Sequence, residues 1–142
     1  MIHKSIIFLL SFQLMPSFAL LATHLILSCP HKDIPLTVEI ARTPQEHASG
    51  LMFREYLAEY AGMLFLFLKP KAAAMWMKNT PLSLDIIFCN WNGQILAIYE
   101  NTTPFSLDTI GPVKGTAQVL EINGGTVQKH GISRECWLRL DP

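Results

Sequence analysis

Residues 84–99, LDIIFCNWNGQILAIY, decide the fold class of this chain. Residues 84–89 are apolar apart from Asp85 and rich in β-forming side chains, which is typical of a buried strand. Asn92-Gly93 is a strong hairpin signal, because both residues tolerate the positive φ angles that a tight turn requires. The apolar run at residues 94–99 then returns, so the stretch predicts two antiparallel strands.

Two short helices are expected elsewhere in the chain. Thr43 can cap the first with its hydroxyl, Pro44 suits the first helical position, and Glu46 completes a capping box. Asn123 is expected to cap the second, over residues 124–130. Each helix should end at a glycine, which tolerates the conformation of a C-cap: Gly50 and Gly131.

Strand-like runs fill most of the remaining chain, and turns separate them. Residues 30–33 are an expected turn, and residues 102–115, with two prolines, are expected to be mostly loop. Short turns between successive strands favour antiparallel pairing. We therefore expect an α+β domain, mainly antiparallel β, built as a curled sheet or small barrel of about 7–8 strands with two short helices. The expected strands are residues 24–27, 36–40, 62–67, 74–77, 84–89, 94–99, 117–122 and 136–140.

The N-terminal segment predicts export. Lys4 precedes an apolar run over residues 5–22, and Ser17-Phe18-Ala19 provides the small residues of a signal-peptidase site. We expect residues 1–19 to be removed as a signal peptide and residues 22–142 to form one domain in the periplasm or outside the cell. The alternative is an uncleaved membrane anchor, which needs about 20 apolar residues, whereas a proline and a glutamine interrupt this run.

Charge and cysteine content narrow the possible partners. Removal of Lys4 leaves 10 basic against 11 acidic residues, a formal charge of −1, which does not suit nucleic acid. Membrane contact is expected only through the N-terminal segment. The cysteines lack Cys-x-x-Cys spacing, so a zinc site is not expected. One disulfide with one cysteine left over, or buried free thiols, are both compatible with Cys29, Cys89 and Cys136.

Five short motifs occur in a fixed order: Gly50-Leu51-Met52-Phe53-Arg54, Gly62-Met63-Leu64-Phe65, Trp76-Met77-Lys78-Asn79-Thr80, Leu84-Asp85 and Val119-Leu120-Glu121. With the Thr-x-x-Glu start at Thr43, they resemble the DUF192 family of bacterial and archaeal proteins from about residue 36 onward. The resemblance implies a small, mainly β domain, often exported, and no established activity. Two departures are Ser133-Arg134-Glu135 in place of Gly-Asp, which puts a terminal turn in doubt, and Met75 in place of Phe, a core exchange.

A polar cluster in an otherwise apolar chain is the candidate binding site. Lys78, Asn79 and Thr80 follow an expected strand, and Asp85 lies in the next one. Cationic donors, an amide, a hydroxyl and carboxylates together suit a small polar ligand such as a sugar or a carboxylate. We expect a non-enzymatic exported module that binds such a ligand or an envelope protein, without a cofactor. The expected ligand-binding residues are Arg54, Trp76, Lys78, Asn79, Thr80, Asp85 and Glu121.

Three alternatives use the same region. The polar residues could form a purely structural network of ion pairs. A hydrolase acting on envelope carbohydrate would use Asp85 and Glu121 as its acid–base pair. Thioether ligands select Cu(I), so Met52, Met63 and Met77 could handle copper, although methionines also fill irregular core space.

Overall fold

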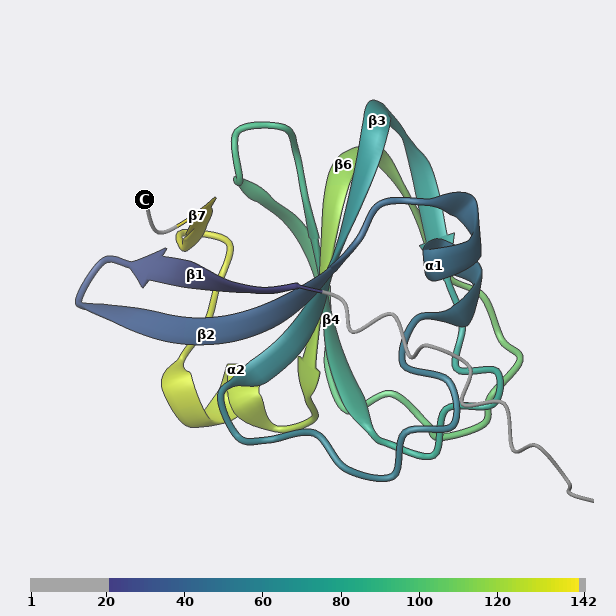
Figure 1. Ribbon diagram of the computed structural model, residues 1–142. Helices are drawn as coiled ribbons and strands as arrows, with labels where there is room; N and C mark the ends of the chain where they lie inside the picture. Colours follow the sequence, from purple (N-terminus) through teal and green to yellow (C-terminus); the bar gives the residue numbers. More distant parts are fainter. Residues whose placement is uncertain (1–20, 141–142) are drawn as a thin grey trace, which may run out of the picture.

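A computed structural model describes residues 21–140 of the chain (Figure 1). The signal peptide expected at residues 1–19 lies outside the described residues. The strands are β1 (Ala22–Cys29), β2 (Lys32–Ala41), β3 (Ala61–Met75), β4 (Leu84–Cys89), β5 (Ile95–Tyr99), β6 (Ile110–Asn123) and β7 (Trp137–Leu140). The helices are α1 (Pro44–Ser49) and α2 (Thr126–His130).

The seven described strands form one curled sheet in the order β5-β4-β6-β3-β2-β1-β7. All neighbours pair antiparallel except β2 and β3, which run parallel. Helices α1 and α2 lie on opposite sides of the central strands (Figure 1). The expected α+β architecture, mainly antiparallel with two short helices, is therefore confirmed as a half-barrel.

The hairpin predicted at residues 84–99 is β4 and β5, and its turn closes the curl. The side-chain oxygen of Asn90 accepts hydrogen bonds from the backbone N–H groups of Asn92 and Gln94, each at 3.0 Å. The carbonyl of Gly93 in turn accepts one from Leu138 N at 2.8 Å, and Gln94 bridges to Trp137. The turn thus joins β7, the strand at the far edge of the sheet.

The curl gives the sheet two packed faces. All seven strands contribute buried side chains to the concave core, and Val127 and Ile132 cover it at and just beyond α2. The central strands supply Met63, Phe65, Ile86 and Phe88 to the convex core. Three residues from the connecting segments cover this second core: Leu51, Leu57 and Met77.

The first helix forms as predicted. The hydroxyl of Thr43 accepts from Glu46 N at 3.1 Å, and the Glu46 carboxylate accepts from Thr43 N at 2.9 Å, which completes the capping box. Pro44 begins the helix and Gly50 is its C-cap. Residues 134–135 form a turn before β7, so the departure at Ser133-Arg134-Glu135 keeps a turn there.

The prediction that Asn123 caps the second helix is wrong. Asn123 ends β6, and its Nδ2 donates to the carbonyls of Leu57 and Ala58. Helix α2 begins at Thr126 after Gly125, and its first turn is held by Asp85, whose Oδ2 accepts from Val127 N at 2.8 Å. A carboxylate distant in the sequence has replaced the local cap.

Two strand assignments also need correction. Residues 62–67 and 74–77 were expected as separate strands, whereas β3 runs through both, with register shifts after Leu66, and ends at Met75. Residues 102–115 were expected to be mostly loop, but β6 begins at Ile110. The first half of β6 pairs only with β3, so its other edge has no partner strand there. Pro112 lacks an N–H group, but no interstrand hydrogen bond is lost on that unpaired edge.

The structure selects one disulfide among the three cysteines. Cys29 at the end of β1 is bonded to Cys136 just before β7, across 107 residues of chain. Cys89 is a buried free thiol, and burial raises its pKa to about 12.

We expect loss of the disulfide to lower the free energy of unfolding by about 2–5 kcal/mol, because the unfolded chain gains conformational freedom. Denaturant unfolding of the double variant Cys29→Ser/Cys136→Ser measures this loss. Dithiothreitol should destabilise the wild-type protein and leave the double variant unchanged. Equal stability of the two proteins without reductant would contradict the assignment.

We expect Gly93→Ala to destabilise the protein by at least about 2 kcal/mol more than Gly131→Ala. Gly93 has a φ of +84°, and an added Cβ would lie 1.9 Å from the carbonyl oxygen of Leu138. Gly131 also has a positive φ, of +63°, but no atom within 4 Å of that position. Equal losses in denaturant unfolding would show that the contact with β7 is dispensable.

Candidate functional site

Glu121 is an acidic side chain buried on the convex face of the sheet. It lies on β6 between Met63 of β3 and Ile86 of β4, which are its cross-strand neighbours. The residue is 4% exposed and has no hydrogen-bond or ion-pair partner among the described residues. Burial raises the pKa of its carboxyl to about 8, so the group is mostly protonated at neutral pH.

Glu121 opens onto a small crevice of about 30 Å³, which has room for a water molecule or one small polar group. Three segments build it: α1 with the residues after it, the end of β3, and the turn that follows β3. The lining residues besides Glu121 are His47, Ala48, Ser49, Gly50, Leu51, Met52, Phe65, Met75, Trp76, Lys78 and Thr80.

The polar groups of the crevice are held by short-range contacts. Thr80 donates its hydroxyl proton to the carbonyl of Lys78 at 3.0 Å. The Lys78 ammonium lies 5.0 Å from the centre of the Trp76 ring, in a cation–π contact. A ring nitrogen of His47, Nε2, is 3.0 Å from the carbonyl of Ala41. The crevice therefore offers an ammonium, a hydroxyl and a neutral carboxyl in a largely apolar wall.

Strained backbone surrounds the crevice. Two aromatic residues, Phe53 and Phe105, have φ angles of +64° and +62°, and Asn79 also has a positive φ. Phe53 N donates to the carbonyl of Asn79 at 2.6 Å, and Phe105 N donates to that of Thr80 at 3.1 Å. Bulky residues rarely adopt this conformation, and such strain gathers at functional sites.

The strained loops present aromatic side chains to solvent. Phe53 follows Met52, which lines the crevice, and Phe105 is bonded to Thr80, which also lines it. Both rings are exposed, and so is Trp76 in the crevice wall. Of these three exposed aromatic side chains, Trp76 lines the crevice, and the backbones of Phe53 and Phe105 bond to the turn that follows β3.

Four of the predicted site residues meet at this crevice: Trp76, Lys78, Thr80 and Glu121. Asn79 lies beside them and directs its amide toward the sulfur of Met52, at 4.0 Å. Arg54 lies outside the lining, because both of its terminal nitrogens pair with Glu39, at 2.5 and 2.6 Å. The structural alternative expected Arg54 or Lys78 to pair with Asp85 or Glu121, whereas Arg54 pairs with Glu39.

Asp85 lies on the other face of the sheet. It pairs in register with Ile122, whereas its neighbour Ile86 pairs with Glu121, so the two carboxylates point to opposite sides. Asp85 is fully buried, and its two oxygens accept from Asn101 N and Val127 N, each at 2.8 Å. Asp85 and Glu121 therefore share no cleft in which an acid–base pair could act.

The methionines considered as copper ligands lie in two different surroundings, the convex core and the crevice. Met63 and Met77 are buried in the convex core, and the Met77 sulfur accepts from the Thr102 hydroxyl at 3.2 Å. Met52 lines the crevice. Within residues 21–140, no group of three or more His, Cys, Asp and Glu side chains is placed to hold a metal ion. Core packing accounts for Met63 and Met77.

Sequence reasoning missed the contribution of the segment after α1. His47 and Gly50 line the crevice, yet their sequence suggested only a helix and its end, and Met52, which also lines it, was considered only as a copper ligand. The left-handed conformations of Phe53 and Phe105 have no sequence signal, because phenylalanine seldom adopts them without tertiary contacts.

Residues 27–140 match the family model of DUF192, described as an uncharacterized ACR. The chain belongs to the DUF192 family. No curated protein matches it.

Two solved structures are similar to this DUF192 chain. A proposed transcription regulator from Sinorhizobium meliloti 1021 has a TM-score of 0.84 and 37% identity, over 86% of this chain and 95% of that one. A protein of unknown function from Novosphingobium aromaticivorans DSM 12444 has a TM-score of 0.83 and 34% identity, over 88% and 89%. Four of the five motifs that carry the resemblance supply crevice residues: 50–54, 62–65, 76–80 and 119–121.

We expect Glu121→Gln to remove a pH dependence of stability. The raised pKa means that the folded protein keeps a proton that the unfolded chain releases above about pH 4.5. This stabilisation is complete below that pH and is lost as the pH rises through about 8. Glutamine does not ionise, so the Glu121→Gln variant does not lose this stabilisation. The free energy of unfolding of the variant minus that of the wild type should therefore rise by up to about 1.4 kcal/mol per pH unit between about pH 4.5 and pH 8.

Denaturant unfolding at several pH values measures this difference, with the exposed Glu100→Gln as the matched control. A constant difference between wild type and Glu121→Gln across the range would show that the carboxyl is ionised in the folded protein.

Proposed function

We propose that this DUF192 protein is an exported, non-catalytic binding module for a small hydroxyl-rich ligand, held at the Glu121 crevice. The observation that carries the proposal is the Glu121 carboxyl, which belongs to a residue only 4% exposed, opens onto the crevice and has no polar protein partner among the described residues. Leaving such a group unpaired costs free energy, which a ligand hydroxyl would recover. A neutral carboxyl both donates and accepts one hydrogen bond, which matches a hydroxyl group.

The shape of the opening favours a sugar-like molecule. The crevice admits only one small group, so the remainder of a ligand would lie on the rim. There, the exposed Trp76 ring could pack against the apolar face of a sugar ring, and Lys78 could donate to its oxygens. An envelope protein could use the same exposed rim, but the crevice volume favours a small ligand.

A non-catalytic role fits the single carboxyl at the crevice. Acid–base hydrolysis of a glycoside uses two carboxyl groups flanking one bond. Asp85, the partner considered from the sequence, holds α2 on the opposite face. The binding proposal needs only the neutral carboxyl, the ammonium of Lys78 and the Trp76 ring.

The disulfide supports export. Disulfides persist in oxidising compartments such as the periplasm and are rare in the reducing cytosol. Cys29 and Cys136 are bonded in the folded domain, and the N-terminal segment has the pattern of a signal peptide. Within residues 21–140, none of the helices has the length and apolar character that a membrane span requires.

Titration with neutral mono- and disaccharides, such as glucose and N-acetylglucosamine, tests the proposal by NMR shift changes and calorimetry. We expect at least one sugar to bind with a dissociation constant below about 1 mM and to shift resonances of the crevice residues. Glu121→Met keeps the side-chain length but removes both hydrogen bonds, so it should weaken binding at least about tenfold, a loss of about 1.4 kcal/mol.

Trp76→Leu should weaken sugar binding as well, whereas Trp137→Leu should not. These tryptophans are 48% and 46% exposed, which makes them a matched pair on different parts of the surface. The proposal fails if no sugar perturbs the crevice, or if Glu121→Met and Trp76→Leu, both folded, bind as well as the wild type.

A further inference from the structure

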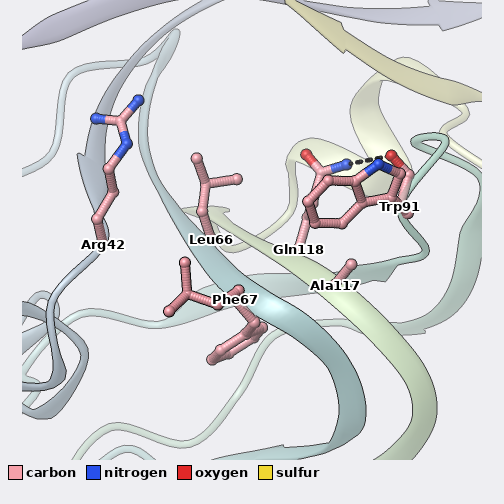
Figure 2. A pocket seen from close by; sticks show the side chains of 7 residues that line it. Arg42, Leu66, Phe67, Trp91, Ala117 and Gln118 are labelled. Atoms are coloured by element: carbon pink, nitrogen blue, oxygen red, sulfur yellow. Dashed lines mark hydrogen bonds between the residues drawn. The ribbon is translucent and has the colours of Figure 1, made fainter.

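The concave side of the half-barrel has an open end with an apolar groove (Figure 2). Its volume is about 340 Å³, which is in the range of small-molecule sites, and barrel mouths are common places for them. The lining residues are Arg42, Leu66, Phe67, Leu68, Trp91, Ala117 and Gln118. No side chain of this groove lines the Glu121 crevice, so the two are separate.

The strand register explains why these residues meet. Ala41 pairs with Phe65, so Arg42 follows at the level of Leu66, which pairs with Gln118. Gln118 also pairs with the last residue of β4, and the turn carrying Trp91 comes next. Residues at the same level of four neighbouring strands therefore form a row, and the concave core ends at this row. Figure 2 shows Arg42 on one side of the groove, Trp91 on the other and Leu66 between them.

An irregularity in the pairing of β3 with β6 leaves apolar side chains exposed to solvent at this end of the sheet. The register with β6 shifts between Leu66 and Lys71, and Leu68 within the shift is 95% exposed. Trp91 is also exposed, at the tip of the β4–β5 hairpin. Contiguous exposed apolar groups beside a groove mark a binding surface more often than scattered ones do.

The groove is basic at its rim. Arg42 lines it and makes no side-chain ion pair with a described residue, while the carboxylate of Glu46 accepts from the backbone N–H of Arg42. The Lys71 ammonium lies 4.4 Å from the centre of the ring of Phe67, which also lines the groove. None of the lining residues is acidic. The charge at the groove therefore complements an anion.

We propose that the groove binds a single-chain amphiphilic carboxylate, such as a medium-chain fatty acid, as a free molecule. The apolar chain lies against Leu66, Leu68 and Trp91, and the carboxylate pairs with the Arg42 guanidinium. The Gln118 amide donates to the carbonyls of Asn90 at 3.1 Å and Trp91 at 3.4 Å, so it holds the opposite wall in place. An arginine at one end of an apolar groove suits a carboxylate joined to a hydrocarbon chain.

Calorimetric titration of the full-length protein with decanoate, below its micellar concentration, tests this inference. We expect saturable binding of one decanoate per chain, at least tenfold weaker binding of decanol, which lacks the charge, and no binding of acetate, which lacks the chain. Arg42→Gln should weaken decanoate at least tenfold and leave decanol nearly unchanged. Leu68→Ser should weaken both, because it removes apolar contact.

Matched controls separate the groove from the general surface. Arg134→Gln and Leu107→Ser change an exposed arginine and an exposed leucine elsewhere and should bind decanoate like the wild type. Glu121→Met should also bind it normally, because the crevice lies on the other face. Unfolding midpoints of all variants establish that each is folded.

Several outcomes overturn the proposal. Acetate binding as well as decanoate would indicate a simple anion site. Decanoate binding that survives both Arg42→Gln and Leu68→Ser would place the ligand elsewhere. Binding only to anionic phosphatidylglycerol vesicles would assign the face to a bilayer, and concentration-dependent dimerisation without decanoate binding would assign it to a second copy of the chain.

Discussion

The contact between the β4–β5 turn and β7 governs the shape of the domain. Leu138 N donates to the carbonyl of Gly93 at 2.8 Å, and the two backbones approach so closely that no side chain fits at residue 93. This contact joins the hairpin at one edge of the sheet to the strand at the other, while the Cys29–Cys136 disulfide ties β7 to β1. An open sheet held in this way has to curl. The concave core then collects side chains from all seven described strands, and the convex face is left for the loops to cover.

Two carboxylates at adjacent register positions of the β4–β6 pair lie on opposite faces of the sheet and in different surroundings. Asp85 faces the concave side, where two backbone N–H groups satisfy it and fix the start of α2. Glu121 faces the convex side, where its surroundings are Met63, Ile86 and a crevice. Desolvation without compensation raises the pKa of Glu121 to about 8. One carboxylate therefore builds the fold, and the other is the polar group that the fold leaves available.

The crevice and the groove arise from different structural causes. The crevice forms where three segments cross over the convex face and bond to one another through strained residues such as Phe53 and Phe105. The groove forms at the end of the concave core, because the pairing of β3 with β6 shifts its register after Leu66. A half-barrel has both a covered outer face and an open end, so one small domain can carry two sites with different chemistry.

Local sequence determined the elements of this protein. Asn92-Gly93 specified the β4–β5 hairpin, Thr43 and Glu46 specified the start of α1, and the short motifs identified the DUF192 family, because turn, cap and strand preferences act over a few residues. The same reasoning singled out Trp76, Lys78, Thr80 and Glu121.

Only the tertiary structure decided which face each side chain occupies and which distant groups meet. A single step along β4 and its pairing with β6 separates Asp85 from Glu121, and no local preference encodes that pairing. The helix cap supplied by Asp85, the choice of Cys29 and Cys136, and the meeting of Arg42 with Trp91 all depend on contacts between residues tens of positions apart. Such contacts exist only once the sheet has curled, which is why the sequence predicted the parts of the domain more fully than the sites between them.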